Sequence, residues 1–474
     1  MLTRELIDLL PLWIVIAGAL SLLFNEILLK EPGRHFSPYL ALIFSLVAFA
    51  LSLMNLFSIG GERIVLFQGT VLVDWFANAL IAVSLLSTVL TILFSSDYLR
   101  QERAVTGEYY ALVMLATAGM ITLIVATEFL TLFVGLELVS LAGYVLAGYF
   151  RVRERSIEAS LKYFLPGVFA TGLILYGIAT LFGATGSTSF QEISATLTTS
   201  QGQFYAVATA AVLILAGFSF KVAVAPFHAW APDVYDGAAA PVSVVLSTGV
   251  KAAAFAALLR MFIEAFNFPG TWIGAFAVLS IITMILGNVG AFLQKNVKRM
   301  LAYSSVAHAG YVMIAFTAVK IASADYVYHS VAVYMLAYTL MTGGAFGLLG
   351  YLGQKGETKT DLADFAGLAR SAPWVAVVMA VFMFSLAGFP PTAGFFGKYY
   401  VFKLAIENNY VWLAVVGILN SFLSVYFYLR VIVYMFMEPQ SEKPELKKPS
   451  VFLISAILLC VVGIFIAGFL PVGG

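Results

Sequence analysis

The sequence is poor in charged residues and in cysteine, and each scarcity excludes a class of protein. Charged residues make up 11% of the 474 residues, against about 25% in a typical soluble domain. A single cysteine, Cys460, permits neither an internal disulfide nor a cysteine-based metal site. The net charge of +1 leaves no basic excess for binding nucleic acid. These scarcities argue against a soluble enzyme, a disulfide-stabilised domain and a nucleic-acid-binding protein.

Motifs that bind cofactors are also missing from the sequence. We find no GxGxxG motif after a strand, no Walker loop, no CxxC, no HExxH and no GxSxG. We therefore expect no nucleotide, flavin, iron–sulfur cluster or metal on this chain. It follows that the chain alone should carry out no redox chemistry.

Long apolar runs are abundant, and they predict an all-α polytopic membrane protein. Hydrophobic residues make up 61% of the chain, and its mean hydropathy is +0.96. A membrane-spanning helix needs about 20 apolar residues. Runs of this kind predict fourteen transmembrane helices, near 7–28, 38–59, 72–96, 109–126, 128–149, 161–184, 204–225, 241–266, 272–293, 300–319, 326–352, 373–406, 410–437 and 449–470.

The twelfth run is too long for one straight span. A helix over 373–406 would measure about 51 Å, against a hydrocarbon core of about 30 Å. Pro390 and Pro391 interrupt this run, and Pro226 interrupts the seventh. Proline lacks the backbone N–H that a helix interior requires. We therefore predict that helices 7 and 12 are broken.

Basic residues in the loops predict the orientation of the chain. The loops after the odd-numbered helices hold 16 Lys and Arg residues, whereas the N-terminus and the opposite loops hold three. Because basic loops stay in the cytoplasm, we expect both termini on the outer, periplasmic face of the inner cell membrane.

Two short sequences recur at similar separations and predict an internal repeat. LAGF begins both 215–230 and 386–401, and AGYV recurs at 142–145 and 309–312. Each offset covers five helices, so the second copy would be inverted, as in many transporters. We predict a three-helix segment at 1–107, a first repeat at 108–266, an inverted repeat at 267–437, and a C-terminal loop and helix at 438–474.

Four charged residues lie inside otherwise apolar runs: Glu137, Lys221, Lys251 and Lys398. A charge at the membrane centre costs about 2.5–3.5 kcal/mol on insertion scales. Because all four side chains can titrate, we predict that they carry protons across the membrane. The alternatives are a lysine that extends to the interface, for Lys221, and a polar packing contact, for Glu137.

Other polar residues are candidates for a secondary relay. Glu158 and Lys162 share one helix face and can equally form a solvated ion pair. His308 and His228 can exchange protons near neutral pH, and packing histidines are the alternative. We interpret Asp233 and Asp236 as parts of a Gly/Pro-rich structural loop or as helix caps.

Several motifs resemble the antiporter-like membrane subunits of respiratory complex I, over about residues 108–437. The motifs are GLELVSLAGYVLAGY, RSIEASLKYFLPG, LYGIATLFGATGSTSF, FKVAVAPFHAWAPDVYDGAAAPVSVVLSTGVKAAAFAALLR, NVKRMLAYSSVAHAGYV and FSLAGFPPTAGFFGKYYVF. APDVYDGAAAP followed by a helix-8 lysine, and a lysine in broken helix 12, are typical of the subunit N group. The resemblance assigns proton translocation to Glu137, Lys221, Lys251 and Lys398, and more weakly to Glu158, Lys162 and His308.

The resemblance also implies partners and cofactors. The expected partners are other membrane subunits of the complex, including neighbouring antiporter-like and small helical subunits. Quinone, FMN and iron–sulfur clusters are expected on other subunits. The expected function is proton pumping coupled to quinone reduction. A subunit of a multisubunit Na⁺/H⁺ antiporter or of a membrane-bound hydrogenase, and a purely structural bundle, are the alternatives.

Overall fold

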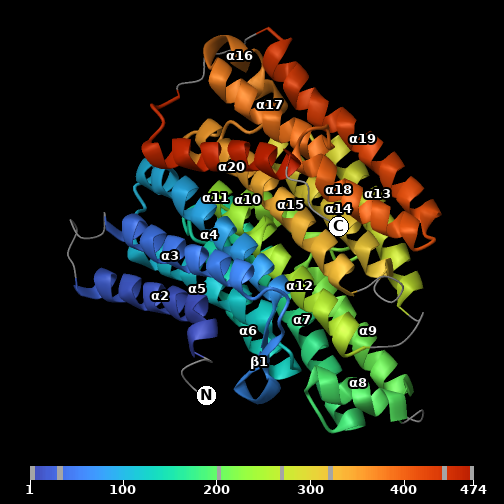
Figure 1. The fold of residues 1–474 in the computed structure, drawn as a ribbon. Coiled ribbons are helices and arrows are strands. Elements are labelled where there is room, and N and C mark those ends of the chain that lie inside the picture. Colours follow the sequence, from blue (N-terminus) through green and yellow to red (C-terminus); the bar gives the residue numbers. More distant parts are fainter. Residues whose placement is uncertain are drawn as a thin grey trace.

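The computed structural model describes residues 6–28, 36–199, 204–266, 272–318, 324–439 and 446–469, and most of them lie in long helices packed side by side (Figure 1). The longer helices are α2 (Leu10–Leu28), α3 (Ser37–Ser58), α4 (Trp75–Glu102), α5 (Gly107–Val125), α6 (Phe129–Ala147), α7 (Glu154–Thr185), α9 (Phe204–Lys221), α12 (Gly249–Glu264), α13 (Ile273–Leu293), α14 (Val297–Ala315), α15 (Ala324–Leu352), α17 (Pro373–Ala387), α18 (Ala393–Glu407), α19 (Val411–Phe436) and α20 (Val451–Phe469).

Short elements connect these helices. They are the antiparallel strands β1 (Ile64–Leu66) and β2 (Val71–Val73), the helices α8 (Phe190–Thr199), α10 (Trp230–Gly237), α11 (Ala240–Ser247) and α16 (Leu368–Ser371), and the 3-10 turns η2 (Phe67–Gly69), η4 (Phe316–Ala318), η5 (Lys355–Glu357) and η6 (Leu362–Phe365). α8 lies between predicted spans, and the hairpin lies between the second and third predicted spans except for the end of β2, which overlaps the start of the third. Hydropathy could not predict them, because neither is a long apolar run.

Thirteen helical segments of the described chain are long and apolar enough to cross a membrane, with α11 and α12 counted as one. They fall on thirteen of the fourteen predicted spans. The remaining prediction, 373–406, corresponds to α17 and α18. Pro390 and Pro391 lie between these two helices, so the predicted break in helix 12 is confirmed. The inverted repeats and the segment boundaries remain predictions.

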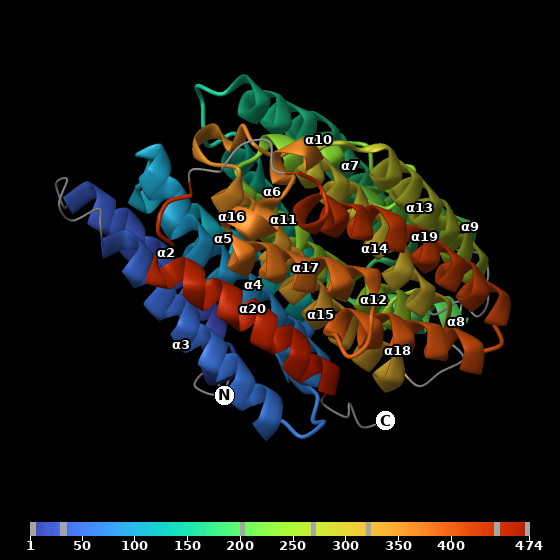
Figure 2. The same cartoon turned by 90° about the horizontal axis from the view of Figure 1, so that it is seen from above.

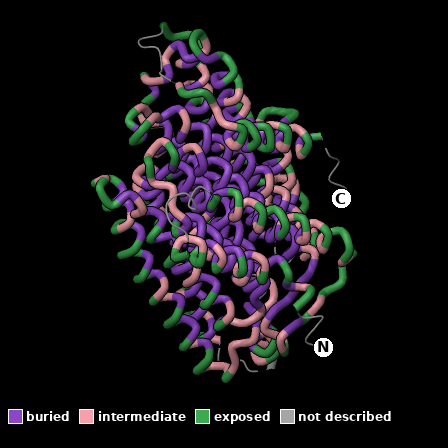
Figure 3. Tube along the Cα trace, turned by 90° about the vertical axis from the view of Figure 1, so that its left-hand side faces the viewer, coloured by how far each residue is buried: buried purple, intermediate pink, exposed green. Residues whose placement is uncertain are grey.

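Burial divides the helices into a centre and a periphery (Figure 3). α4 and the α11–α12 segment are buried along their whole apolar windows, and α14 and α15 are nearly so. No more than a third of the apolar window of α2, α3 or α20 is buried, and these three helices lie along one edge of the molecule (Figure 2). A helix that is apolar on all sides belongs in an interior. The candidate lysines are carried by helices in and around this centre.

Two breaks in the backbone shape the interior. α9 ends at Lys221, and residues 222–229, which include Pro226, form a non-helical link before α10. The interpretation of Asp233 and Asp236 as loop residues is wrong, because both lie in α10. A second break separates α11 from α12 at Thr248, whose ψ of −77° departs from helical geometry. No proline marks this second break, and the sequence predicted one continuous span there.

Candidate functional site

Lys221 is the last residue of α9, and its amine is buried among hydroxyl groups. The side chain is only 8% exposed. Its Nζ donates to Ser140 Oγ on α6 at 2.8 Å, and lies 3.4 Å from Tyr144 OH and 3.5 Å from Thr171 Oγ1. These oxygens replace the water that a buried ammonium would lose. The amine is therefore held inside the helices and does not extend to the interface.

Glu137 lies near this amine but does not contact it directly. Thr171 Oγ1 donates to Glu137 Oε1 at 2.8 Å, and the same hydroxyl lies 3.5 Å from Lys221 Nζ. Both charged residues are in the described part of the chain, and no direct ion pair joins them there. Glu137 is half-buried on α6, so it is less enclosed than its sequence surroundings suggested. Thr171 links the two charges, and sequence analysis had not singled it out.

Lys251 lies in the first turn of α12, immediately after the break at Thr248, and is 1% exposed. Its Nζ donates to the carbonyl oxygen of Ser305 at 2.9 Å and to Ser305 Oγ at 2.6 Å. Tyr338 OH donates to the same Oγ at 2.8 Å. No carboxylate of the described chain pairs with this amine, so its partners are neutral oxygens. Such surroundings tolerate both the charged and the neutral amine.

His308 lies between the Lys251 and Lys398 sites, on α14. Its Nδ1 shares a hydrogen bond of 2.7 Å with Tyr334 OH, and its Nε2 shares one of 3.3 Å with Tyr428 OH. The ring centroid lies 5.2 Å from that of Tyr338, beside Lys251. It lies 5.7 Å from that of Tyr311, whose ring is 5.2 Å from Lys398 Nζ. The imidazole thus belongs to one continuous group of aromatic and hydroxyl side chains between the two amines.

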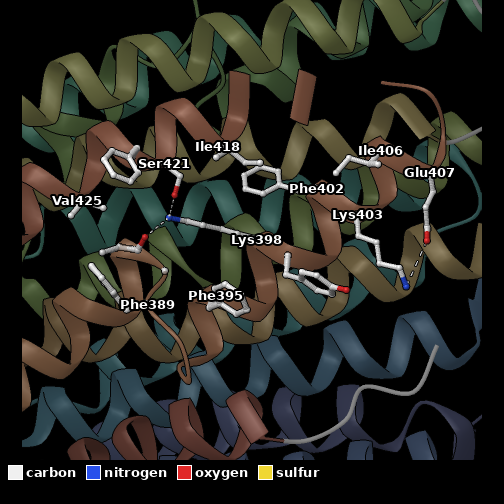
Figure 4. Close-up of a pocket in the computed structure, with 14 residues that line it drawn as sticks. Phe389, Phe395, Lys398, Phe402, Lys403, Ile406, Glu407, Ile418, Ser421 and Val425 are labelled. Atoms are coloured by element: carbon white, nitrogen blue, oxygen red, sulfur yellow. Dashed lines mark hydrogen bonds and ion pairs between the residues drawn. The ribbon is translucent and has the colours of Figure 1, made fainter. Parts of the chain in front are cut away.

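Lys398 lies in α18, one turn beyond the break that contains Pro390 and Pro391. Its Nζ donates to the carbonyls of Leu386 and Ala387 at 3.1 Å each. It also donates to Ser421 Oγ at 2.8 Å (Figure 4). Those carbonyls are the last two of α17, where the helix dipole favours a cation.

A cavity of about 640 Å³ between α18 and α19 adjoins Lys398. Apolar side chains such as Phe402 and Ile418 line much of it, and Lys403 and Glu407 lie at its far end (Figure 4). Ile418 and Phe422 are exposed on the surface of the chain. The cavity therefore brings the Lys398 site close to the membrane-facing surface.

Glu158 and Lys162 form the ion pair that their spacing predicted, but they are not part of the buried group. Lys162 Nζ lies 2.6 Å from Glu158 and 2.8 Å from Asp233, and the two α7 side chains are 61% and 45% exposed. Arg299 lies 2.6 Å from the other Asp233 oxygen. Burial raises the pKa of the Asp233 carboxyl, but the hydrogen bonds from Lys162 and Arg299 outweigh this and hold the pKa below its ordinary value. This network ties α7, α10 and α14 together near one end of the bundle.

His228 lies half-buried in the link that contains Pro226. Within the described chain, no hydrogen bond joins it to Lys221 or Lys251. The structure therefore separates His228 from the buried amines and places His308 among them. In the described ranges, no group of three or more His, Cys, Asp or Glu residues is arranged to hold a metal.

Sequence analysis missed another buried charge, Arg260, which is completely buried in α12. Its guanidinium donates to both oxygens of Asp74, at 2.8 and 3.1 Å, and lies 3.4 Å from Glu264. Asp74 also caps α4 by accepting from Ala77 N at 2.8 Å. The signal was present in the sequence as a lone arginine in FAALLRMF. Because arginine does not release its proton in proteins, this pair suits a structural role.

The amines of Lys221, Lys251 and Lys398 and the imidazole of His308 are surrounded by hydroxyl groups and backbone carbonyls. Each of the three lysines lies beside a break in a helix, and His308 lies between the Lys251 and Lys398 sites. Amines and imidazoles can gain and lose protons, and hydroxyl groups can pass protons between them through hydrogen bonds. The arrangement supports proton transfer through the membrane interior.

Comparison with known proteins agrees with this geometry. The family model described as NADH:quinone oxidoreductase/Mrp antiporter, transmembrane, matches residues 126–424. NADH-quinone oxidoreductase subunit N of Trichlorobacter lovleyi is 42% identical over 87% of this chain and 84% of that protein. Subunit N 2 of Roseiflexus castenholzii is 42% identical over 97% and 92%.

Among solved structures, a chain of respiratory complex I from Thermus thermophilus with bound aureothin matches 97% of each chain, with a TM-score of 0.81 and 33% identity. The family model covers more than half of the sequence, and the curated relatives cover most of it at over 40% identity. The chain therefore belongs to the NADH:quinone oxidoreductase/Mrp antiporter family of membrane subunits.

Proposed function

We propose that this chain is the proton-translocating subunit N of an NADH:quinone oxidoreductase and couples quinone reduction elsewhere in that complex to proton pumping. The observation that carries the proposal is the buried group that extends from Lys221 through Lys251 and His308 to Lys398. The names of the curated relatives and the match to a complex I chain support it.

In the proposed path, a proton enters from the cytoplasm near Lys221, passes to Lys251, and leaves outward near Lys398 with His308 as an intermediate carrier. Glu137 favours the charged form of Lys221 when the two approach, and desolvation favours the neutral form when they separate. The bridging position of Thr171 supports this role, because a small side-chain movement would make or break the contact.

The chain contributes no redox step in this proposal. Quinone, FMN and iron–sulfur clusters are placed on other subunits, whose reaction changes the charge next to Glu137. The half-buried position of Glu137 and the cavity beside Lys398 support contacts with neighbouring membrane subunits, because a charge at membrane depth needs cover from lipid.

We also propose that both termini face the outside and that the basic loops face the cytoplasm. An even number of crossings, with α17 and α18 counted as one broken span, would bring the ends to the same side. The uneven distribution of Lys and Arg between alternate loops supports this orientation.

The direct test is to purify the tagged chain from its membrane and to identify the proteins that accompany it. We expect the other subunits of an NADH:quinone oxidoreductase, together with proton uptake into inverted vesicles when NADH is added. Sodium transport by the purified assembly, without quinone reductase subunits, would favour the antiporter alternative and would contradict the proposal.

Glu137→Gln is expected to lower coupled turnover more than Glu158→Gln does. Glu137 is linked to the buried amine of Lys221 through Thr171, whereas Glu158 is 61% exposed and shares Lys162 with Asp233. Exposed ion pairs contribute only about 0–1 kcal/mol. The measurement is NADH-driven proton uptake by both variants at matched levels of assembled complex, and equal or reversed losses would remove the distinction.

A further inference from the structure

α10 lies between the backbone break that follows Lys221 and the break that precedes Lys251. It is a helix of eight residues, and the chain enters it from the link 222–229 and leaves it toward α11. A broken helix frees carbonyl and N–H groups that must find other partners in a membrane interior. The partners at both breaks come in part from this one short helix.

Trp230 of α10 donates a hydrogen bond to the backbone at the first break. Its indole Nε1 donates to the carbonyl oxygen of Phe220 at 2.9 Å. Phe220 directly precedes Lys221, the last residue of α9. The same carbonyl also accepts from Ala223 N at 3.0 Å, so the indole is its second donor at the end of α9. This contact fixes α10 to the backbone next to the Lys221 amine.

Side chains from α10 and α4 form hydrogen bonds with the backbone on the two sides of the second break. Tyr235 OH donates to the carbonyl of Leu246 at 3.2 Å, and Tyr235 also interacts with Ser305, the partner of Lys251. On the opposite side, Gly249 N donates to Ser87 Oγ of α4 at 3.1 Å. A Cβ at residue 249 would lie 2.8 Å from that oxygen, so only glycine permits this approach.

α10 is fixed to its neighbours by ring packing and by polar contacts from α14. Trp230 stacks on Tyr163 at 4.6 Å and packs against Tyr235 at 5.7 Å. Arg299 bonds Asp233, and Lys298 Nζ donates to the carbonyl of Asp236 at 2.9 Å.

The two donors face in different directions. Trp230 and Tyr235 are five residues apart, which is about 140° around a helix of 3.6 residues per turn. Each therefore points toward a different break.

We propose that α10 couples the Lys221 and Lys251 sites, with Trp230 and Tyr235 as the positioning residues at its two ends. The inference rests on the proposed function, in which a proton passes between these lysines. A displacement of α9 at Lys221 moves Phe220, and Trp230 transmits this to α10. Tyr235 then shifts the carbonyl at the Thr248 break, and with it the first turn of α12 that carries Lys251. Neither aromatic residue carries the proton.

The test uses Trp230→Phe and Tyr235→Phe, singly and together, in the purified complex. Each removes one hydrogen-bond donor and keeps most of the aromatic packing. We expect the protons pumped per NADH to fall by about two- to tenfold in each single variant, the range that one lost hydrogen bond sets. Because the two contacts act in series, we expect the double variant to lose no more than the worse single variant.

Two control variants make the same chemical changes away from the link. Tyr109→Phe removes a buried hydroxyl that bonds Ser95 at 2.8 Å, and Trp272→Phe removes a buried indole with no partner in the described chain. Both controls should pump normally. The coupling role would be wrong if the two single losses added independently, or if Trp230→Phe and Tyr235→Phe pumped as well as the controls.

A parallel Lys251→Ala variant separates this inference from the proposed function. If Lys251→Ala pumps normally, the proton path itself is wrong. If Lys251→Ala loses pumping while the α10 variants keep it, only the coupling role of α10 is wrong.

Discussion

Lys221→Ala is expected to abolish proton pumping and quinone-coupled turnover while the complex still assembles. The substitution removes a buried amine that donates to Ser140 and lies close to Tyr144 and Thr171. Those hydroxyl groups can pass a proton but cannot store one near neutral pH. The measurement is NADH-driven proton uptake into inverted vesicles, with the amount of assembled complex determined in the same membranes.

Two further substitutions at this position distinguish a proton carrier from a fixed charge. Lys221→Met keeps a long apolar side chain, so its assembly controls for the volume lost in alanine. Lys221→Arg keeps the positive charge but does not release a proton under these conditions. We expect both to fail in pumping. Normal pumping by the arginine variant would show that only the positive charge of Lys221 matters. If every variant lost activity only because the complex failed to assemble, the proposed role of Lys221 as a proton carrier would be refuted.

The spans of this protein could be predicted from sequence because membrane-crossing helices leave a strong physical signal. About 20 apolar residues are needed to cross the hydrocarbon core, and thirteen of the predicted runs correspond to long apolar helices, with the α11–α12 segment counted as one. Pro390 and Pro391 marked the break between α17 and α18, since proline removes a backbone donor. The buried lysines were visible for the same reason, as charges in apolar runs.

The break before Lys251 could not be predicted in this way. Its local sequence, LSTGVK, contains no proline. The break depends on Ser87 from α4 and Tyr235 from α10, which are distant in sequence and contribute hydrogen bonds only in the folded state. α10 was interpreted as a loop because its glycines and prolines are turn formers. Its helical state depends on packing against α7 and α14, and local helix propensity gives no information about such contacts.

The contact between Glu137 and Lys221 through Thr171 also could not be predicted from the sequence. Spacing placed both residues within apolar runs but could not show that Thr171 lies between them. Arg260 is the opposite case. Its signal was present, but its partner Asp74 lies 186 positions away in the chain. Distant pairs of this kind become apparent only when helices from different parts of the chain are packed together.

Lys221 and Lys398 differ in a way that affects what each can tolerate. Lys221 ends the first half of its broken helix and donates to side-chain hydroxyls. Lys398 lies in the second half of its own broken helix and donates to the last two carbonyls of α17. The carbonyl end of a helix favours a cation or a neutral donor and disfavours an anion. The Lys398 site should therefore accept any group that can present a proton to those oxygens.

Lys398→Ala is expected to lose most proton pumping, whereas Lys398→Glu is expected to retain part of it. A protonated glutamate can donate to the carbonyl of Leu386 or Ala387, and it can also release that proton outward. Alanine leaves both carbonyls and Ser421 without the amine. A buried polar group that loses its partner costs about 1–3 kcal/mol.

The difference between the two variants is measured as proton uptake into inverted vesicles at matched levels of complex. Raising the concentration of quinone or NADH should not restore pumping in the alanine variant, because neither is expected to bind this chain. Lys403→Ala is a matched control, since that lysine lines the same cavity but is 37% exposed and lies near Glu407. If Lys398→Ala pumps as well as this control, or if glutamate is no better than alanine, Lys398 is not the group that releases protons outward.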